Sequence, residues 1–332
     1  MSDNSSIENE VEQLLGELTF DEKFELISGS PHWFFKGNKR LGIPALQTAN
    51  GPSGIRPYLK TPDYPEGTFQ TAKTTAYPAG IALASSWDHE ILKNVGQSIA
   101  CECNEKGVDV LLGPCVCLVR LPCGGRNFES YGEDPVLSGK LAASYINGVQ
   151  GQGVAATIKH YVCNDTEYKR HSVDIHLTQR TLRELYLRTF EIAIRKAPPW
   201  AVMASYNHIN GVRMCDNHYL ETELLKDKWG FEGFVMSDWG GVFSGEPAFA
   251  AGMDLDMPNG KYFASSELKQ IVSASSEYRK ILDDKVKRLI RFAMVRKQFL
   301  ETPLKQISLD TKRKTAKKAA QESIVLLKND RN

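Results

Sequence analysis

The sequence predicts an α/β fold in which the strands close into a barrel covered by helices. Short apolar segments of strand type alternate with segments of helical periodicity along most of the 332 residues. Polar, glycine-rich loops follow the strands. Six or more such strand–helix units favour a closed barrel over an open sheet. In barrels of this kind, the loops at the carboxyl ends of the strands carry the chemistry.

Composition excludes several classes of protein. The chain is 42% hydrophobic and 24% charged, as globular proteins are, and its 41 basic and 40 acidic residues give a net charge of +1. We therefore expect no nucleic-acid partner. No apolar run approaches the roughly 18 residues of a membrane span, so no membrane association is expected. Residues 1–15 are polar and acidic and lack the positively charged and apolar regions of a signal peptide, which predicts a cytoplasmic location.

The seven cysteines are an odd number and fit a reducing compartment. Cys101 and Cys103 form one Cys-x-Cys pair, and Cys115 and Cys117 form another. Zinc sites prefer two to four residues between paired ligands, so buried thiols explain these pairs better than a metal site does. We predict no metal and no cofactor.

The first third of the chain contains a capped helix and a tight loop. Thr19 and Glu22 have the spacing of a capping box and predict a helix through Ile27. Residues 51–54 contain two glycines and a proline, which predicts a fixed loop with Asn50 beside it. The alternative is a plain turn, which these residues taken alone favour.

A helix over 86–106 and a strand over 108–112 precede a long loop, 120–135. The loop carries two arginines, two aromatic residues and three acids among several glycines. Long irregular loops in compact domains tend to be functional. A helix over 135–149 follows.

The next strand, 154–158, ends in Lys159 and His160. Neighbouring residues of a strand point to opposite sides, so both can reach one site only if the backbone bends there. The alternative is a surface lysine and a histidine in a core contact.

The second half continues the alternation of helices and strands. Helices are predicted over 178–196, 220–229, 265–299 and 312–328, and strands over 201–206 and 252–258. Asn210-Gly211 predicts a turn.

The strand at 234–236 leads directly into Asp238 and Trp239. This places a carboxylate at the carboxyl end of a strand, where barrels build their active sites. The alternative is that Asp238 caps the following helix or turn.

Six ordered blocks carry a family resemblance that covers nearly the whole chain. They are GPSGIR (51–56), GGRNFESYGEDPVLSG (124–139), GVAATIKHYVCND (153–165), SYNHING (205–211), GFVMSDWGG (233–241) and AGMDLDMP (251–258). The sequence resembles the N-terminal domain of glycoside hydrolase family 3, in particular the fungal β-glucosidases. The resemblance implies a TIM-type (β/α) barrel over 1–300. It also implies that 301–332 is a linker and the start of an α/β sandwich domain.

The function that the resemblance implies is retaining hydrolysis of terminal, non-reducing β-D-glucosyl residues, with a small-molecule β-glucoside or an oligosaccharide as substrate. A retaining enzyme needs a carboxylate that attacks the anomeric carbon, and the resemblance assigns this role to Asp238. The sugar-binding positions of the family fall on Asn50, Arg126, Lys159, His160, Tyr206 and Trp239. Charged side chains there would hold the sugar hydroxyls by charge-assisted hydrogen bonds.

Four further acids are expected to have supporting roles. Asp254 and Asp256 fall on a later barrel strand and are interpreted as structural. Glu129 and Glu133 are interpreted as loop or substrate-positioning groups.

The chain departs from the family at two places. The block that usually begins Asp-Gly-Pro has Asn50, which predicts weaker glucose binding. No general acid/base was identified: β-glucosidases of this family supply a Glu from the following domain, and the single-domain N-acetylglucosaminidases use an Asp-x-His pair. Here His171 is present, but Lys169 stands where that Asp would be.

The resemblance reaches the family's linker block, AAQESIVLLKND (319–330), where the chain stops. We therefore expect a truncated β-glucosidase of impaired activity, whose exposed apolar seam favours self-association. The alternative is a catalytically silent glucoside-binding barrel or fragment. A barrel aldolase or isomerase using Lys159 as a Schiff base is disfavoured by the six ordered blocks.

Overall fold

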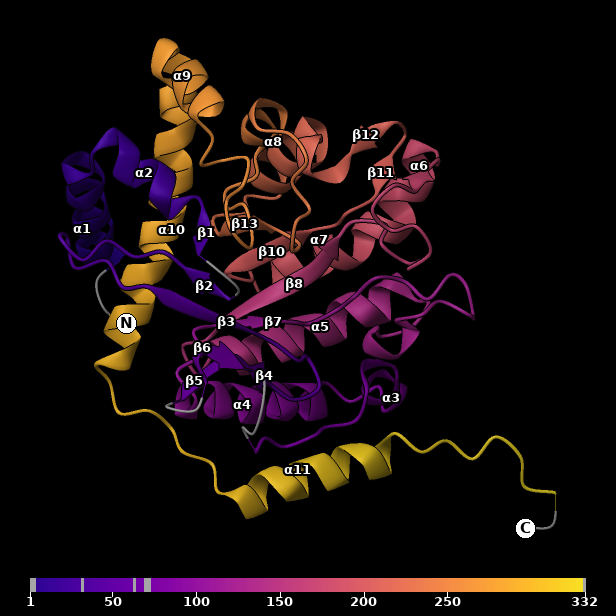
Figure 1. Cartoon of the computed structure of the whole chain (residues 1–332). Coiled ribbons are helices and arrows are strands. Elements are labelled where there is room, and N and C mark those ends of the chain that lie inside the picture. Colours follow the sequence, from indigo (N-terminus) through magenta and orange to yellow (C-terminus); the bar gives the residue numbers. More distant parts are fainter. Residues whose placement is uncertain (1–3, 31–32, 62–63, 69–72, 331–332) are drawn as a thin grey trace.

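The computed structural model describes residues 4–30, 33–61, 64–68 and 73–330 (Figure 1). At its centre, one curled sheet has the strand order β1 (Gly29–Ser30), β2 (Phe34–Phe35), β3 (Leu46–Asn50), β7 (Val110–Leu112), β8 (Ala155–Tyr161), β10 (Ala201–Ala204) and β13 (Phe234–Ser237), with β4 (Arg56–Pro57) attached to β3. Neighbouring strands from β3 to β13 are parallel. The predicted parallel arrangement is confirmed for this part of the sheet.

The sheet closes into a barrel through the segment that contains Leu255 and Asp256. Leu255 forms a parallel bridge with Met236 of β13, and Asp256 forms one with Ser28, next to β1. The Ser237 amide donates to the Leu255 carbonyl at 3.0 Å, and the Gly29 amide donates to the Asp256 carbonyl at 3.0 Å. The predicted TIM-type barrel is confirmed, although the strand expected over 252–258 is reduced to these two bridges.

The first strands of the sheet depart from the predicted parallel arrangement. β1 is antiparallel to β2, and β2 is antiparallel to β3. A parallel neighbour needs a long crossover connection, usually a helix, whereas an antiparallel neighbour needs only a short turn. β1 ends at Ser30 and β2 begins at Phe34, which leaves no room for a crossover helix.

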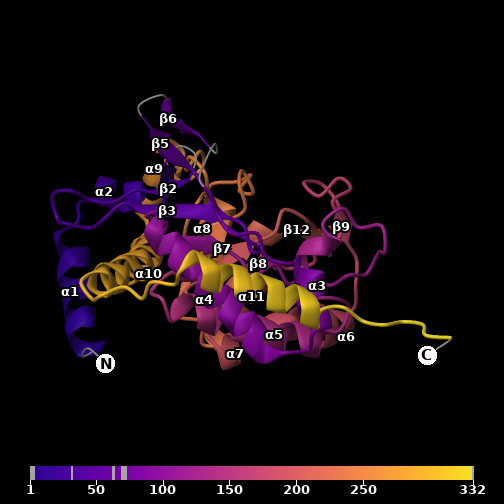
Figure 2. The same ribbon diagram turned by 90° about the horizontal axis from the view of Figure 1, so that it is seen from below.

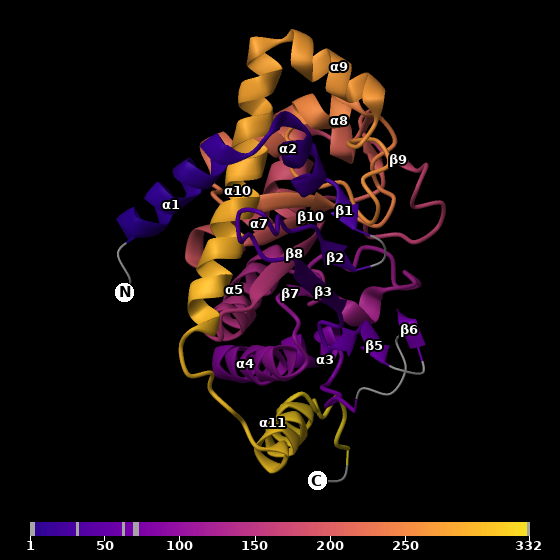
Figure 3. The same cartoon turned by 60° about the vertical axis from the view of Figure 1, so that its left-hand side comes forward.

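The main helices form the outer layer of the barrel (Figure 3). They are α4 (His89–Glu105), α5 (Pro135–Gln150), α7 (Leu187–Lys196) and α10 (Ser276–Leu300). Asp88 and Asp134 cap α4 and α5 by accepting from the first backbone amides of each helix. All residues of β8, β10 and β13 are buried, as is typical of parallel strands covered by helices.

Shorter elements complete the fold. The N-terminal helices are α1 (Asn4–Glu17) and α2 (Phe20–Leu26), and Thr19 and Glu22 form the predicted capping box. The other helices are α3 (Gly80–Ser85), α6 (Gln179–Thr181), α8 (Glu246–Ala251) and α9 (Ser266–Ala274), with the π-helices η2 (Leu182–Tyr186) and η4 (Tyr219–Lys228) and the 3₁₀ turns η1 (Asn127–Glu129) and η3 (Met214–Asp216). None of the helices in the described residues is both long and apolar enough to cross a lipid bilayer.

Two small sheets lie outside the barrel. One contains β9 (Asp174–Ile175), β11 (His208–Ile209) and β12 (Val212–Arg213), and the other contains β5 (Leu59–Thr61) and β6 (Tyr64–Thr68). Asn210 and Gly211 join β11 to β12 with φ angles of 49° and 87°. Positive φ at both positions is the signature of the two-residue hairpin turn that Asn-Gly favours, so the predicted turn is confirmed.

The last helix, α11 (Leu309–Glu322), packs on the outside of α4 and α3 (Figure 2). Lys312 anchors it through an ion pair of 2.7 Å with Glu105. The helix predicted over 312–328 instead ends at Glu322. Beyond it lie four successive apolar residues, Ile324–Leu327, which are exposed, with Leu327 at 92%.

Candidate active site

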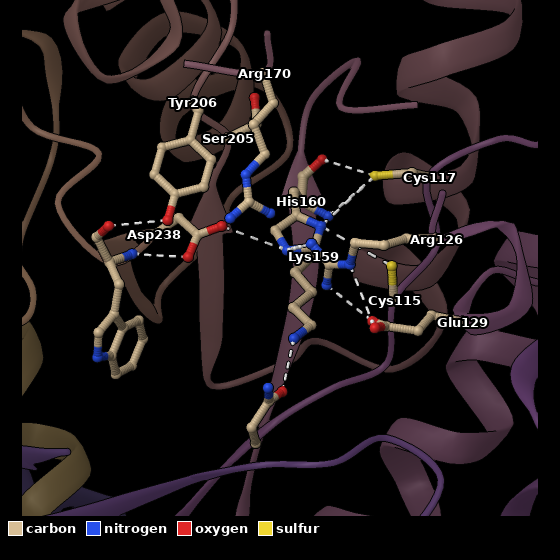
Figure 4. A network of polar contacts seen from close by, with 12 residues as sticks. Cys115, Cys117, Arg126, Glu129, Lys159, His160, Arg170, Ser205, Tyr206 and Asp238 are labelled. Carbon is tan, nitrogen blue, oxygen red and sulfur yellow. Dashed lines mark hydrogen bonds and ion pairs between the residues drawn. The ribbon is translucent and has the colours of Figure 1, made fainter. Parts of the chain in front are cut away.

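Asp238 lies immediately after β13, at the carboxyl end of the barrel strands (Figure 4). Its Oδ1 atom accepts a hydrogen bond of 2.7 Å from the Trp239 amide. Its Oδ2 atom lies 3.5 Å from Nε2 of His160. The N-cap of the next helix, α8, is Gly245, so Asp238 does not cap a helix, but it does begin a turn, because its carbonyl accepts from the Gly241 amide at 2.8 Å. One oxygen of Asp238 is fixed by the backbone, and the other faces the opposite wall of the site.

Lys159 and His160 form that wall because β8 bends where they lie. Met203 of β10 pairs with Lys159, whereas Ala204 pairs with Tyr161, so His160 is the extra residue of a bulge. The two residues are only 3% and 2% exposed. Lys159 Nζ donates to the Asn50 Oδ1 atom at 3.2 Å. The expected bend is confirmed, and the alternative of a surface lysine is wrong.

Arg126 is supplied by the long loop 120–135. Its Nη1 atom lies 3.3 Å from His160 Nε2, and its Nη2 atom donates to Glu129 at 2.8 Å. Burial would raise the pKa of Glu129, but the hydrogen bond from Arg126 and the charge of Lys159 outweigh burial and lower it. Glu129 is therefore a charged partner that orients Arg126.

Tyr206 and Trp239 form the aromatic side of the site. The Tyr206 hydroxyl donates to the Trp239 carbonyl at 2.9 Å, and the indole of Trp239 packs on Trp33 with ring centroids 4.7 Å apart. Arg170 lies over the Tyr206 ring at 4.9 Å from its centroid. Burial and the charge of Asp238 raise the pKa of Tyr206, so its hydroxyl stays a donor near neutral pH.

His160 is neutral near pH 7. Burial lowers its pKa well below the usual value, and the charges of Arg126 and Lys159 lower it further. Burial and Arg126 also lower the pKa of Lys159, against the opposing effect of acidic neighbours that include Asp238. A neutral imidazole with its proton on Nε2 donates to Asp238, whereas one protonated on Nδ1 accepts there from Arg126.

Comparison with known proteins identifies the family. Residues 45–292 match the family described as "Glycosyl hydrolase family 3 N terminal domain". The chain belongs to glycosyl hydrolase family 3.

Curated proteins named β-glucosidases resemble the chain along almost all of its length. It is 40% identical over 325 residues to "Probable beta-glucosidase J" of Neosartorya fischeri, covering 97% of this chain and 37% of that protein. It is 38% identical over 321 residues to "Thermostable beta-glucosidase B" of Acetivibrio thermocellus, covering 97% of this chain and 42% of that protein. The chain thus spans about two fifths of the length of these relatives.

Solved structures of proteins named β-glucosidases share the fold. β-Glucosidase 3B from Thermotoga neapolitana, in complex with glucose, is 38% identical and superposes with a TM-score of 0.87, covering 97% of this chain and 48% of that one. The β-glucosidase of Kluyveromyces marxianus, also in complex with glucose, is 35% identical with a TM-score of 0.89, covering 97% of this chain and 38% of that one.

All six positions that the resemblance assigned to sugar binding lie near the carboxyl ends of barrel strands, directly after such strands, or on a loop beside them. Asn50 ends β3, Lys159 and His160 lie in β8, and Tyr206 and Trp239 follow β10 and β13. Arg126 contacts His160, which faces Asp238, and Tyr206 bonds to Trp239, while Lys159 and Asn50 form a separate pair (Figure 4). Their roles toward a sugar remain predictions.

The other acids occupy different surroundings. Asp254 accepts from Lys226 at 2.6 Å, and Asp256 accepts from the Tyr262 amide at 3.0 Å. Both are buried and hold the closing segment of the barrel, as a structural role requires. Glu133 is exposed.

Sequence reasoning missed several residues of the site. Arg170 pairs with Glu167 at 2.8 Å, and Glu167 also lies 3.7 Å from Arg126. His171, which was considered only as part of an acid/base pair, instead packs on the Tyr206 ring with centroids 4.1 Å apart. These residues share one loop after β8, and its density of charge was the available signal.

Proposed function

We propose that this chain carries the nucleophile side of a retaining β-glucosidase site. The observation that supports this most is the placement of Asp238, whose Oδ2 atom faces His160 at 3.5 Å while its Oδ1 atom is held by the Trp239 amide. Relatives covering the same region are named β-glucosidases, and two of the similar structures are glucose complexes. The substrate class is a β-glucoside or a short oligosaccharide.

In the proposed reaction, the Asp238 carboxylate attacks the anomeric carbon and forms an ester bond to the sugar. The bond to the aglycone breaks, and its electron pair leaves with the aglycone oxygen. Water then cleaves the ester and releases glucose with its configuration retained. Arg126 and Lys159 would hold sugar hydroxyls by charge-assisted hydrogen bonds, which places the anomeric carbon against Asp238.

Protonation of the leaving oxygen is not assigned to this chain. Glu129 and Glu167 are the carboxyl groups next to Arg126, and both form ion pairs with arginines. An ion-paired carboxylate is a poor proton donor. We therefore expect this chain to react with glucosides whose leaving group needs no protonation.

The second candidate function is a glucoside-binding barrel without turnover. Asn50 favours it, because the family's usual aspartate at this position is an amide here. This barrel would keep the sugar contacts but form no ester.

The two candidates are separated by mass spectrometry after incubation with 2,4-dinitrophenyl 2-deoxy-2-fluoro-β-glucoside. The fluorine slows hydrolysis of the ester, and the leaving group departs without an acid. We expect the mass of one fluoroglucosyl group to be added per chain and mapped to the peptide containing Asp238. If no label were attached but calorimetry showed that the chain binds glucose, the result would support the silent glucoside-binding barrel instead.

Asn50→Asp is expected to tighten glucose binding by about fivefold, because charged acceptors form hydrogen bonds stronger by about 1 kcal/mol. The Asn50 Oδ1 atom accepts from both Lys159 and the Gly51 amide, so a second, charged oxygen would be available to the sugar. The dissociation constant is measured by calorimetry. Asn94→Asp, the same change on the exposed face of α4, serves as the control, and equal affinities in the two variants would contradict the prediction.

Self-association is proposed for the exposed run Ile324–Leu327, since contiguous exposed apolar residues favour association. Sedimentation velocity should show species larger than the monomer, and Leu326→Glu/Leu327→Glu should shift the protein to monomer. A wild-type chain that sediments as a monomer at all concentrations tested would refute this.

A further inference from the structure

Two cysteines that the proposed glycosidase chemistry does not use lie against His160. Cys115 and Cys117 occupy the extended segment after β7, and Cys115 forms a parallel bridge with Lys159. Residues two apart in an extended segment point to the same side, so both sulfurs face β8. The Cys115 and Cys117 Sγ atoms lie 3.9 and 3.8 Å from His160 Nδ1 (Figure 4).

These three atoms have the spacing of a metal-ligand set. Both sulfurs and the imidazole nitrogen lie within 4.8 Å of one another, and all three residues are buried. Zinc bonds to sulfur at about 2.3 Å and to nitrogen at about 2.0–2.1 Å, so a tetrahedral ion separates these ligands by about 3.6 Å. The observed distances exceed this by a few tenths of an ångström, which small side-chain rotations would close.

A small cavity beside the cluster supplies room for a fourth ligand. Its volume is about 10 Å³, close to the space that one water needs, and Cys115, Cys117 and His160 are part of its lining. Asn164 and Asp165 line the same cavity. Within the described part of the chain, both side-chain polar atoms of Asn164 and the Oδ1 atom of Asp165 lack a hydrogen-bond partner.

These unpartnered atoms indicate a bound ligand, and this indication does not depend on the positions of the cysteines. Asn164 is only 6% exposed, and a buried polar group without a partner costs about 1–3 kcal/mol. A water bound to a metal in the cavity could satisfy both residues.

The other nitrogen of His160 also fits metal binding. A metal-bound histidine commonly donates its second ring N–H to a carboxylate, which fixes the ring. His160 Nε2 lies 3.5 Å from Asp238 Oδ2. The neighbouring cations Arg126 and Lys159 oppose a further positive charge, but two thiolates would neutralise a divalent ion.

We propose that Cys115, Cys117 and His160 form a binding site for a thiophilic divalent cation, with Zn²⁺ as the best match, and that a water in the adjoining cavity is its fourth ligand. Binding replaces the two thiol protons with the metal and releases them to solvent. This site goes beyond the proposed glycosidase function and does not depend on it.

One consequence does rest on the proposed function. The bound cation would draw electron density from the imidazole, so the His160 Nε2–H group would donate a stronger hydrogen bond to the Asp238 carboxylate and make it a weaker nucleophile. Nucleophilic attack should then slow, so saturating Zn²⁺ should reduce the rate of fluoroglucosyl labelling. If Zn²⁺ slowed labelling of Cys115→Ser as much as it slowed labelling of the wild type, the effect would belong to another metal site.

The direct test uses Co²⁺ as a spectroscopic probe on the reduced chain. We expect one Co²⁺ per chain, with a thiolate-to-cobalt charge-transfer band and the intense visible bands of tetrahedral Co²⁺, both lost on addition of Zn²⁺. Loss of a supporting partner of a metal ligand costs about 10- to 100-fold in affinity, so Cys115→Ser and Cys117→Ser should each lose at least that much. Cys123→Ser, which removes an exposed cysteine, should leave the spectrum unchanged.

A second measurement needs no variant. Zn²⁺ should protect Cys115 and Cys117 from alkylation in the wild-type chain while Cys123 is still modified, as mapped by peptide mass spectrometry. A chain that gives no thiolate–cobalt band, or whose band is lost in Cys123→Ser, would overturn the proposal. Equal rates of alkylation of Cys115 and Cys117 with and without Zn²⁺, in denaturant at which both are modified in the metal-free chain, would also overturn it.

Discussion

Replacing Asp238 with alanine should reduce release of dinitrophenol from 2,4-dinitrophenyl β-glucoside by about 10⁴-fold or more, the range seen when a covalent nucleophile is removed. The leaving group needs no acid, so this substrate reports on nucleophilic attack alone. The structure offers a specific reason for the loss. The Asp238 Oδ2 atom faces His160, whereas the neighbouring acids Glu129 and Glu167 are engaged by arginines.

Azide should restore much of the lost rate in Asp238→Ala. Alanine leaves a space in which a small anion can attack the anomeric carbon from the face that the carboxylate used. The product should be α-glucosyl azide, because a single displacement inverts the configuration. Asp227→Ala, which removes an exposed carboxylate from η4, is the control and should keep the wild-type rate. A β-configured azide product would show that another group in the chain is the nucleophile.

The barrel was predictable from the sequence because its buried strands leave a local signal. Phe234–Met236 is a short apolar run bounded by turn residues, and the structure places β13 there. The antiparallel direction of β2 could not be predicted, because a strand of two residues is too short to show a periodic pattern of apolar residues. The end of α11 was missed because apolar residues such as Leu327 favour a helix locally, but in the part of the chain that the structure describes they are exposed rather than packed.

The site was partly predictable for a different reason. Blocks such as 233–241 carry a family pattern, which placed Asp238 and Trp239 without any knowledge of the fold. The cluster of Cys115, Cys117 and His160 is invisible at that level, because the cysteine spacing alone argues against zinc. Only the pairing of the segment after β7 with the bulged end of β8 brings the histidine to the two sulfurs.

The closing segment of the barrel depends on one buried carboxylate, Asp254. It accepts from Lys226 at 2.6 Å and from the Val235 amide at 2.8 Å, and Lys285 lies 4.0 Å away. Asp254→Ala would leave the buried Lys226 ammonium group without its ion-pair partner, whereas burial and Lys226 already lower the pKa of Lys285 to about 7. Breaking a buried pair in this way costs about 3–5 kcal/mol, so the free energy of unfolding in urea should fall by that amount.

Asp256→Asn is the matched control for that variant, because an asparagine oxygen can still accept from the Tyr262 and Phe263 amides. Burial raises the pKa of Asp256 to about 6, against these amide hydrogen bonds, which lower it. The wild-type residue therefore contributes stability at acidic pH that is lost as the pH rises from about 4 through 6. Asp256→Asn removes this dependence, so it should gain stability relative to the wild type between pH 4 and pH 7. Asp254→Ala should instead be strongly destabilised at pH 7, and equal losses in the two variants would show that the ion pairs of Asp254 do not hold the barrel closed.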